Sequence, residues 1–160
     1  MTPLSRLSRY NSGMSHHAVL VLHLLAAAVW VGGYVFLVLG YAPEALRTRD
    51  PRGLIDAHAR LQRVGLPALV VVIVSGLWLA WNWLPDSTLW FESSLPIANV
   101  ILAKLGLLAL TLLLLTYLRL RVLPTLMPAR ISRLALVLSL IALVGVAAAA
   151  IGPSFRYGGF

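Results

Sequence analysis

Residues 96–118 read PIANVILAKLGLLALTLLLLTYL, an apolar run that contains a single cation, Lys104. About 20 helical residues span the ~30 Å hydrocarbon core of a bilayer, so this run is long enough to cross a membrane. Residues 18–41, 65–83 and 134–151 form three further runs of this kind. With 60% hydrophobic residues and a mean hydropathy of +0.89, the chain is far more apolar than a soluble domain. The sequence predicts an all-α integral membrane protein, a single up-down-up-down four-helix bundle over residues 1–160.

The positive charge is concentrated in two loops. The connections after the first and third runs hold nine arginines, against three elsewhere: Arg47, Arg49, Arg52, Arg60, Arg63, Arg119, Arg121, Arg130 and Arg133 against Arg6, Arg9 and Arg156. The positive-inside rule makes both loops cytoplasmic and both termini periplasmic, in a bacterial inner membrane. The net charge of +8 therefore indicates topology, and no nucleic-acid partner is expected. The first run exceeds the ~7–15 apolar residues of a signal peptide and is expected to be retained.

The first Arg-rich loop also contains a helical pattern. Asp50 followed by Pro51 is typical of a helix start. Apolar residues then recur at helical spacing opposite charged ones, which predicts an interfacial amphipathic helix over about residues 51–64. It leads into the second span, where Pro67 is expected to bend the axis. His58 is expected to pack, and Ser75 and Gly76 to be small helix contacts.

Two ionisable residues inside the spans are the main functional candidates. A charged side chain in a bilayer costs at least ~2.5 kcal/mol, so it usually faces a partner or a cavity. His23 lies ~8 Å and Lys104 ~12 Å below the outer surface at 1.5 Å per residue. Both spans run in the same direction, so the two side chains meet if their helices are neighbours. His16, His23 and Trp30 recur every seven residues and share one helix face, and Gly33 continues it.

Copper is the first ligand that these residues suggest. Met14, His16 and His17 combine a thioether with two imidazoles at the outer start of the first span, a donor set that suits copper. His23 would be the next metal ligand inward, and Lys104 would tune or close the buried site. The alternative is that His16 and His17 are interfacial polar residues. The sequence has no cysteine, which excludes disulfides and thiolate metal sites.

Haem b is the alternative cofactor. A buried histidine commonly holds haem in helical bundles, so His23 would be axial, with Lys104 as sixth ligand or propionate partner. Trp30 and the small residue Gly33 would then border a flat group. The third hypothesis is an accessory subunit of a larger membrane complex. One buried histidine and one buried lysine suit all three hypotheses, and whether the chain is an enzyme stays open.

The segment LHLLAAAVWVGG, residues 22–33, resembles the opening of membrane proteins with the copper-resistance D (CopD) domain. The Ala-Lys-Leu around Lys104, the Arg-Ile-Ser-Arg-Leu before the last span and the closing Arg156-Tyr157-Gly158 also resemble short, four-span members of that group. The resemblance implies copper uptake or resistance, often with a periplasmic copper-binding partner. The histidine and the lysine are also similar to those of HemJ-type protoporphyrinogen oxidases, which bind haem b. The chain lacks their Leu-Pro-Arg-Leu after Gly33.

Overall fold

Four long helices make up most of the protein. The computed structural model describes the backbone of residues 3–92, 94–125 and 131–153, and side chains from Ser15 onward within these ranges, except that of Thr125. The elements in chain order are α1 (Pro3–Phe36), η1 (Leu37–Tyr41), α2 (Ala42–Thr48), α3 (Arg52–Trp83), η2 (Ser87–Phe91), α4 (Pro96–Tyr117), η3 (Leu118–Val122), η4 (Leu123–Thr125) and α5 (Ile131–Ala150). Within the described residues, four stretches are long and apolar enough to span a membrane: Ser15–Thr48, Arg52–Trp83, Pro96–Val122 and Ile131–Ala150. The predicted all-α, four-span membrane fold is confirmed.

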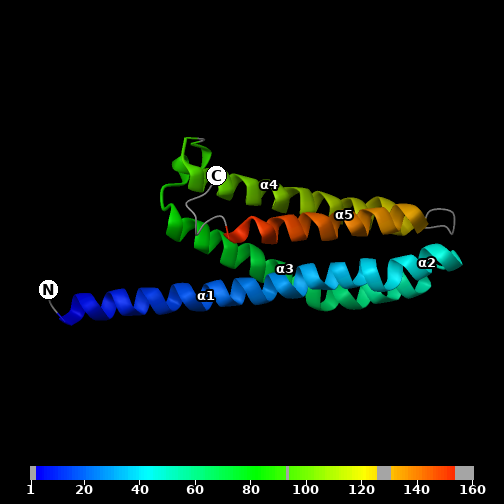
Figure 1. The fold of residues 1–160 in the computed structure, drawn as a ribbon, viewed down its shortest axis with the longest axis horizontal. Coiled ribbons are helices and arrows are strands. Elements are labelled where there is room, and N and C mark those ends of the chain that lie inside the picture. The colour runs from blue at the N-terminus through cyan, green and yellow to red at the C-terminus, as the bar shows by residue number, and fades with distance from the viewer. Residues whose placement is uncertain (1–2, 93, 126–130, 154–160) are drawn as a thin grey trace.

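Successive long helices run in opposite directions, so the start of α1 and the end of α5 lie toward the same end of the bundle (Figure 1). α1 packs along both α3 and α5, and α5 also packs along α4. In the apolar 18-residue stretch of α5, 50% of the residues are buried inside the protein. In the corresponding stretches of the other three spans, the buried share is 17% to 22%. α5 is therefore the central helix, and the other three present more of their apolar surface to lipid.

Small residues bring α1 close to its neighbours. A Cβ atom on Gly33 would overlap the side chain of Leu61 on α3, and a Cβ atom on Gly145 of α5 would lie 3.1 Å from Val31. Without a hydrophobic drive between helices in lipid, such close van der Waals contact is what holds spans together. The glycines thus fix which helices are adjacent to α1.

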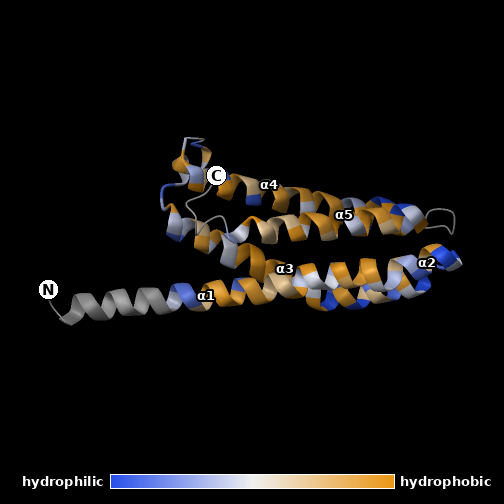
Figure 2. Ribbon diagram, in the orientation of Figure 1, coloured by the Kyte–Doolittle hydropathy of each residue, from blue (hydrophilic) through white to orange (hydrophobic). Residues whose placement is uncertain are grey.

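The two ends of the bundle differ in chemistry. The hydrophilic segments gather around α2, the start of α3 and the end of α4 (Figure 2). We call this the Arg-rich end and define it by Arg47, Arg49, Arg52, Arg60, Arg63, Arg119, Arg121 and Arg133. The opposite end holds His16, His17 and His23 and is called the histidine end. This separation agrees with the charge pattern from which the cytoplasmic side was predicted.

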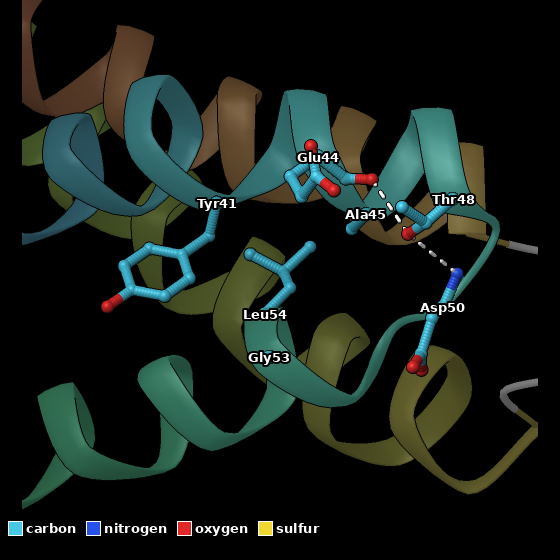
Figure 3. A pocket seen from close by; sticks show the side chains of 7 residues that line it. All are labelled: Tyr41, Glu44, Ala45, Thr48, Asp50, Gly53 and Leu54. Carbon is cyan, nitrogen blue, oxygen red and sulfur yellow. Dashed lines mark hydrogen bonds between the residues drawn. The ribbon is translucent and has the colours of Figure 1, made fainter.

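A tight turn joins α2 to α3 at the Arg-rich end. Arg49 adopts the left-handed conformation with φ 56°, and the Thr48 hydroxyl accepts a hydrogen bond from the Asp50 backbone N–H at 3.3 Å (Figure 3). Asp50 in turn accepts from the backbone N–H of Arg52 at 3.0 Å, and α3 begins at Arg52, so the predicted helix start is correct to within a residue but Pro51 lies at the cap position. From Arg52, α3 continues to Trp83 with Pro67 inside it. The stretch predicted as an interfacial helix and the second span form one continuous helix.

At the histidine end, η2 connects α3 to α4. Asp86 accepts hydrogen bonds from the Thr88 backbone N–H at 2.9 Å and from its hydroxyl at 2.6 Å. These bonds favour the carboxylate and hold the pKa of Asp86 below its ordinary value. The Trp90 indole N–H donates to the carbonyl of Leu84 at 2.8 Å, and its ring lies 6.4 Å from that of Trp81. The connection is thereby tied down over the end of α3.

Candidate functional site

One face of α1 is directed at α3 over much of its length. The His16 ring lies 5.9 Å from the ring of Trp78, and His23 lies within hydrogen-bonding distance of Ser75. Trp30 packs against Gly65, where a Cβ atom would be 3.4 Å from the indole. The prediction that His16, His23 and Trp30 share a helix face is confirmed by these contacts with one neighbouring helix.

The His23 imidazole is held by Ser75. His23 Nδ1 and Ser75 Oγ are 2.9 Å apart, and the Ser75 hydroxyl donates to the carbonyl oxygen of Val71, one turn earlier on α3. Because the hydroxyl hydrogen is used in that bond, we assign Ser75 Oγ as the acceptor and the His23 proton to Nδ1. The lone pair of the imidazole is then on Nε2. A metal-binding histidine usually has this arrangement, with one nitrogen donating to a fixed acceptor and the other facing the metal.

Gly76 allows the ring to lie close to the backbone of α3. A Cβ atom at Gly76 would be 3.1 Å from Cε1 of His23. That distance is tighter than ordinary van der Waals contact, so any larger residue at position 76 would push on the ring. Ser75 and Gly76 together hold the His23 ring close to α3.

Lys104 faces the same end of the bundle from α4. Its side chain is half-buried, and its Nζ is 3.7 Å from the place of a Cβ atom on Gly152, just after α5. The histidine and the lysine are thus both half-buried and both lie toward the histidine end of the bundle.

The sequence model of copper resistance protein D (CopD) matches residues 55–154. The chain belongs to the CopD family. Neither the comparison with curated proteins nor the comparison with solved structures finds a match. The family resemblance predicted from the sequence is thus confirmed, and with its four apolar helices the chain is a multi-pass membrane protein related to copper resistance.

The CopD match covers only part of the candidate site. It covers nearly all of α3 together with α4 and α5, and so includes Ser75, Gly76 and Lys104. His23 lies on α1, before the matched residues. The surroundings of the imidazole are therefore part of the family region, whereas the role of the imidazole has to be argued from its own geometry.

The outer candidate ligands of this CopD-family protein are spread out. The His16 ring contacts Trp78 and also lies 6.4 Å from Trp83, while His17 is exposed. The side chain of Met14 lies outside the described residues. Among the described side chains, no group of three or more histidine or acidic residues converges as a metal site would require. Their assignment as copper ligands stays a prediction.

Trp30 and Gly33 lie deeper, where α1 and α3 are in direct contact. Trp30 is 4% exposed, and its ring lies 4.7 Å from that of Tyr34. Gly33 is covered by Leu61. Below His23, the interface is therefore filled by side chains of the protein itself, and a cofactor role for these two residues stays a prediction.

Sequence reasoning did not identify Ser75 as a partner of His23, nor a second polar cluster. At the Arg-rich end, Gln62 Nε2 donates to the Tyr34 hydroxyl at 2.8 Å and lies 3.2 Å from His58 Nε2. His58 is buried, as its predicted packing role requires, but it is hydrogen-bonded as well. His58 and Gln62 are one helical turn apart, and this spacing could have indicated the polar cluster from the sequence.

Proposed function

We propose that this CopD-family membrane protein binds copper at its histidine end and that His23 Nε2 is a ligand. The observation that carries the proposal is the bond from His23 Nδ1 to Ser75, which leaves Nε2 as the electron-pair donor. Copper(I) and copper(II) both accept imidazole nitrogen. In line with the Arg pattern, the Arg-rich end would face the cytoplasm and the histidine end the periplasm.

The proposal has two copper positions, an outer and an inner one. His16 and His23 are seven residues apart, or ~10 Å along the helix axis at 1.5 Å per residue, so one ion cannot contact both. Met14, His16 and His17 would form the outer position, and His23 the inner one with further donors. Copper would pass from the thioether and imidazoles at the surface to the imidazole within the bundle. Loading from a periplasmic copper-binding partner fits this direction.

A copper ion suits the inner position better than haem does. Gly76 contacts the His23 ring, and Trp30 and Gly33 pack directly on α3. A single ion needs only space beside Nε2, whereas a macrocycle would have to separate these contacts. The packing therefore supports the metal over the haem alternative.

Purification in detergent followed by elemental analysis and an absorption spectrum tests the proposal. We expect bound copper after incubation with copper(I), at up to two ions per chain, and no Soret band after expression with ample haem. A Soret band that disappears when His23 is replaced would assign the site to haem. A colourless protein that takes up no copper would refute both cofactors and leave the accessory-subunit hypothesis.

Lys104 provides a second prediction. An ammonium group on α4 toward the histidine end repels a copper cation, and a loss of repulsion of about 1.4 kcal/mol corresponds to a tenfold change in affinity. The Lys104→Leu variant is therefore expected to bind copper(I) about tenfold more tightly, measured by competition with a colorimetric chelator. Arg63→Leu, which removes a cation at the Arg-rich end, should leave the affinity unchanged. Weaker copper binding in Lys104→Leu would instead make Lys104 a donor to the metal.

A further inference from the structure

A second site lies at the other end of the protein, away from the proposed copper positions. A cavity of about 590 Å³ opens between α3 and α4 toward the Arg-rich end. It is lined by Ile55, His58, Ala59, Gln62, Leu66, Leu69, Leu112, Leu115, Thr116, Leu118, Arg119 and Leu123. Its volume falls in the range of small-molecule pockets, about 300–1,000 Å³. α3 has its main contacts with α1, and α4 with α5, which leaves this space between them.

The cavity is amphipathic along its length. α3 starts at the Arg-rich end, so His58 and Gln62 lie nearer that end and Leu66 and Leu69 deeper. α4 runs the opposite way, so Arg119, just beyond it, lies near the same end and Leu112 lies deeper. The cavity thus has a polar mouth at the membrane boundary and leucine walls within the bilayer.

The polar wall of the cavity is hydrogen-bonded and backed by buried groups. His58 is 6% exposed and Tyr34 0%, and the Gln62 carboxamide joins them by contacts of 3.2 Å and 2.8 Å. Polar groups at such depth are costly unless they are hydrogen-bonded, and a bonded network holds its members in place. The network therefore presents an imidazole and a carboxamide to the cavity in fixed positions.

Arg119 gives the mouth a positive charge that no other lining residue balances. Among the residues that the structure describes, the cavity lining contains neither aspartate nor glutamate. Arg119 is exposed and lies in η3, a π-helical turn over Leu118–Val122 that continues α4. Turns of this kind inside helices are rare and frequent at functional sites. A ligand that complements this mouth carries a negative charge.

We propose that the cavity binds one anionic phospholipid between α3 and α4. The phosphate would pair with Arg119, the headgroup would lie beside Gln62 and Thr116, and an acyl chain would lie along the leucines. An arginine pairs well with phosphate because its guanidinium offers several donors in one plane. Basic pockets between membrane helices are suited to anionic headgroups. A soluble anion would make no apolar contact with the leucine walls, so we assign the cavity to a lipid.

Native mass spectrometry of the purified protein with added lipid tests this site. We expect the wild type to retain one phosphatidylglycerol and to bind phosphatidylcholine of the same chain length at least tenfold more weakly. The Arg119→Gln variant should lose about tenfold in phosphatidylglycerol affinity, as expected for a charge-assisted hydrogen bond. Arg119→Lys, which keeps the charge, should retain part of the preference.

Arg121→Gln is the matched control, because Arg121 is exposed, lies in the same turn and does not line the cavity. Its lipid preference should equal that of the wild type. If Arg119→Gln and Arg121→Gln lose phosphatidylglycerol affinity equally, the effect comes from general surface charge, and the proposed site is overturned. Equal binding of the two lipids by the wild type would overturn the choice of an anionic occupant. Leu115→Trp, which fills the cavity, should abolish the retained lipid, and retention would place the lipid elsewhere.

Discussion

Replacing His23 with glutamine is expected to remove the inner copper position. Copper(I) affinity should fall by more than the ~10–100-fold that loss of a second-shell partner causes, because the ligand itself is lost. The number of bound copper ions should decrease by one per chain. Glutamine is chosen because its carboxamide can still bond to Ser75, which lies 2.9 Å from the imidazole in the wild type. Titration against a competing chelator measures the affinity, and elemental analysis the stoichiometry.

His58→Gln is the control for this substitution. This variant also replaces a histidine with glutamine. His58, however, is buried on α3 at the Arg-rich end, far from the proposed copper positions. This variant should bind copper as the wild type does and elute identically in gel filtration. If His23→Gln keeps the wild-type affinity and stoichiometry, His23 is not a ligand. If both variants lose copper, the loss reflects damage to the bundle.

Helix periodicity was sufficient to predict which residues of α1 face the same way. Residues seven apart repeat after two turns, and His16, His23 and Trp30 all contact α3 as that spacing requires. The depth of a residue also follows from the sequence, since each helical residue rises 1.5 Å. His23 and Lys104 were therefore expected at similar depths, and both are half-buried on helices that begin at the histidine end.

The partner of His23 could not be predicted in this way. Which helix lies opposite a given face depends on packing between apolar surfaces, and these carry little sequence signature in a membrane protein. Ser75 was interpreted as a small contact, because a serine in a membrane helix commonly bonds to the carbonyl one turn before it. It does so here with Val71 and accepts from His23 as well. Only the rotation of α3 relative to α1 reveals the second bond.

The same limit applies to the cavity at the Arg-rich end. His58 and Gln62 are one turn apart on α3, but Tyr34 and Arg119 come from elements far away in the sequence. The charge pattern assigned Arg119, like the other arginines of this end, to membrane topology, and that assignment stays a prediction. Its place at the mouth of an apolar cavity follows from the divergence of α3 and α4, and this divergence arises because each helix packs on a different neighbour.

Replacing Ser75 with alanine is the second large effect that we expect. Without the hydroxyl acceptor, the His23 ring is no longer fixed with its proton on Nδ1, so Nε2 presents its lone pair to the metal in only part of the molecules. Loss of such a second-shell partner typically costs 10–100-fold in metal affinity. Copper(I) affinity should fall by that factor while the stoichiometry at saturating copper stays that of the wild type. This outcome distinguishes a positioning residue from the ligand itself.

The nitrogen NMR shifts of the His23 imidazole give a readout that a general structural defect would not mimic. In the metal-free wild type we expect a protonated Nδ1, and in Ser75→Ala a mixture of both tautomers. Thr111→Val is the matched control, since it removes another buried hydroxyl that bonds to its own helix, at Leu107 of α4. It should alter neither the tautomer nor the copper affinity. A tautomer unchanged in Ser75→Ala would mean that another group holds the ring, with the nearby Val72 carbonyl as the next candidate, and that Ser75 serves packing alone.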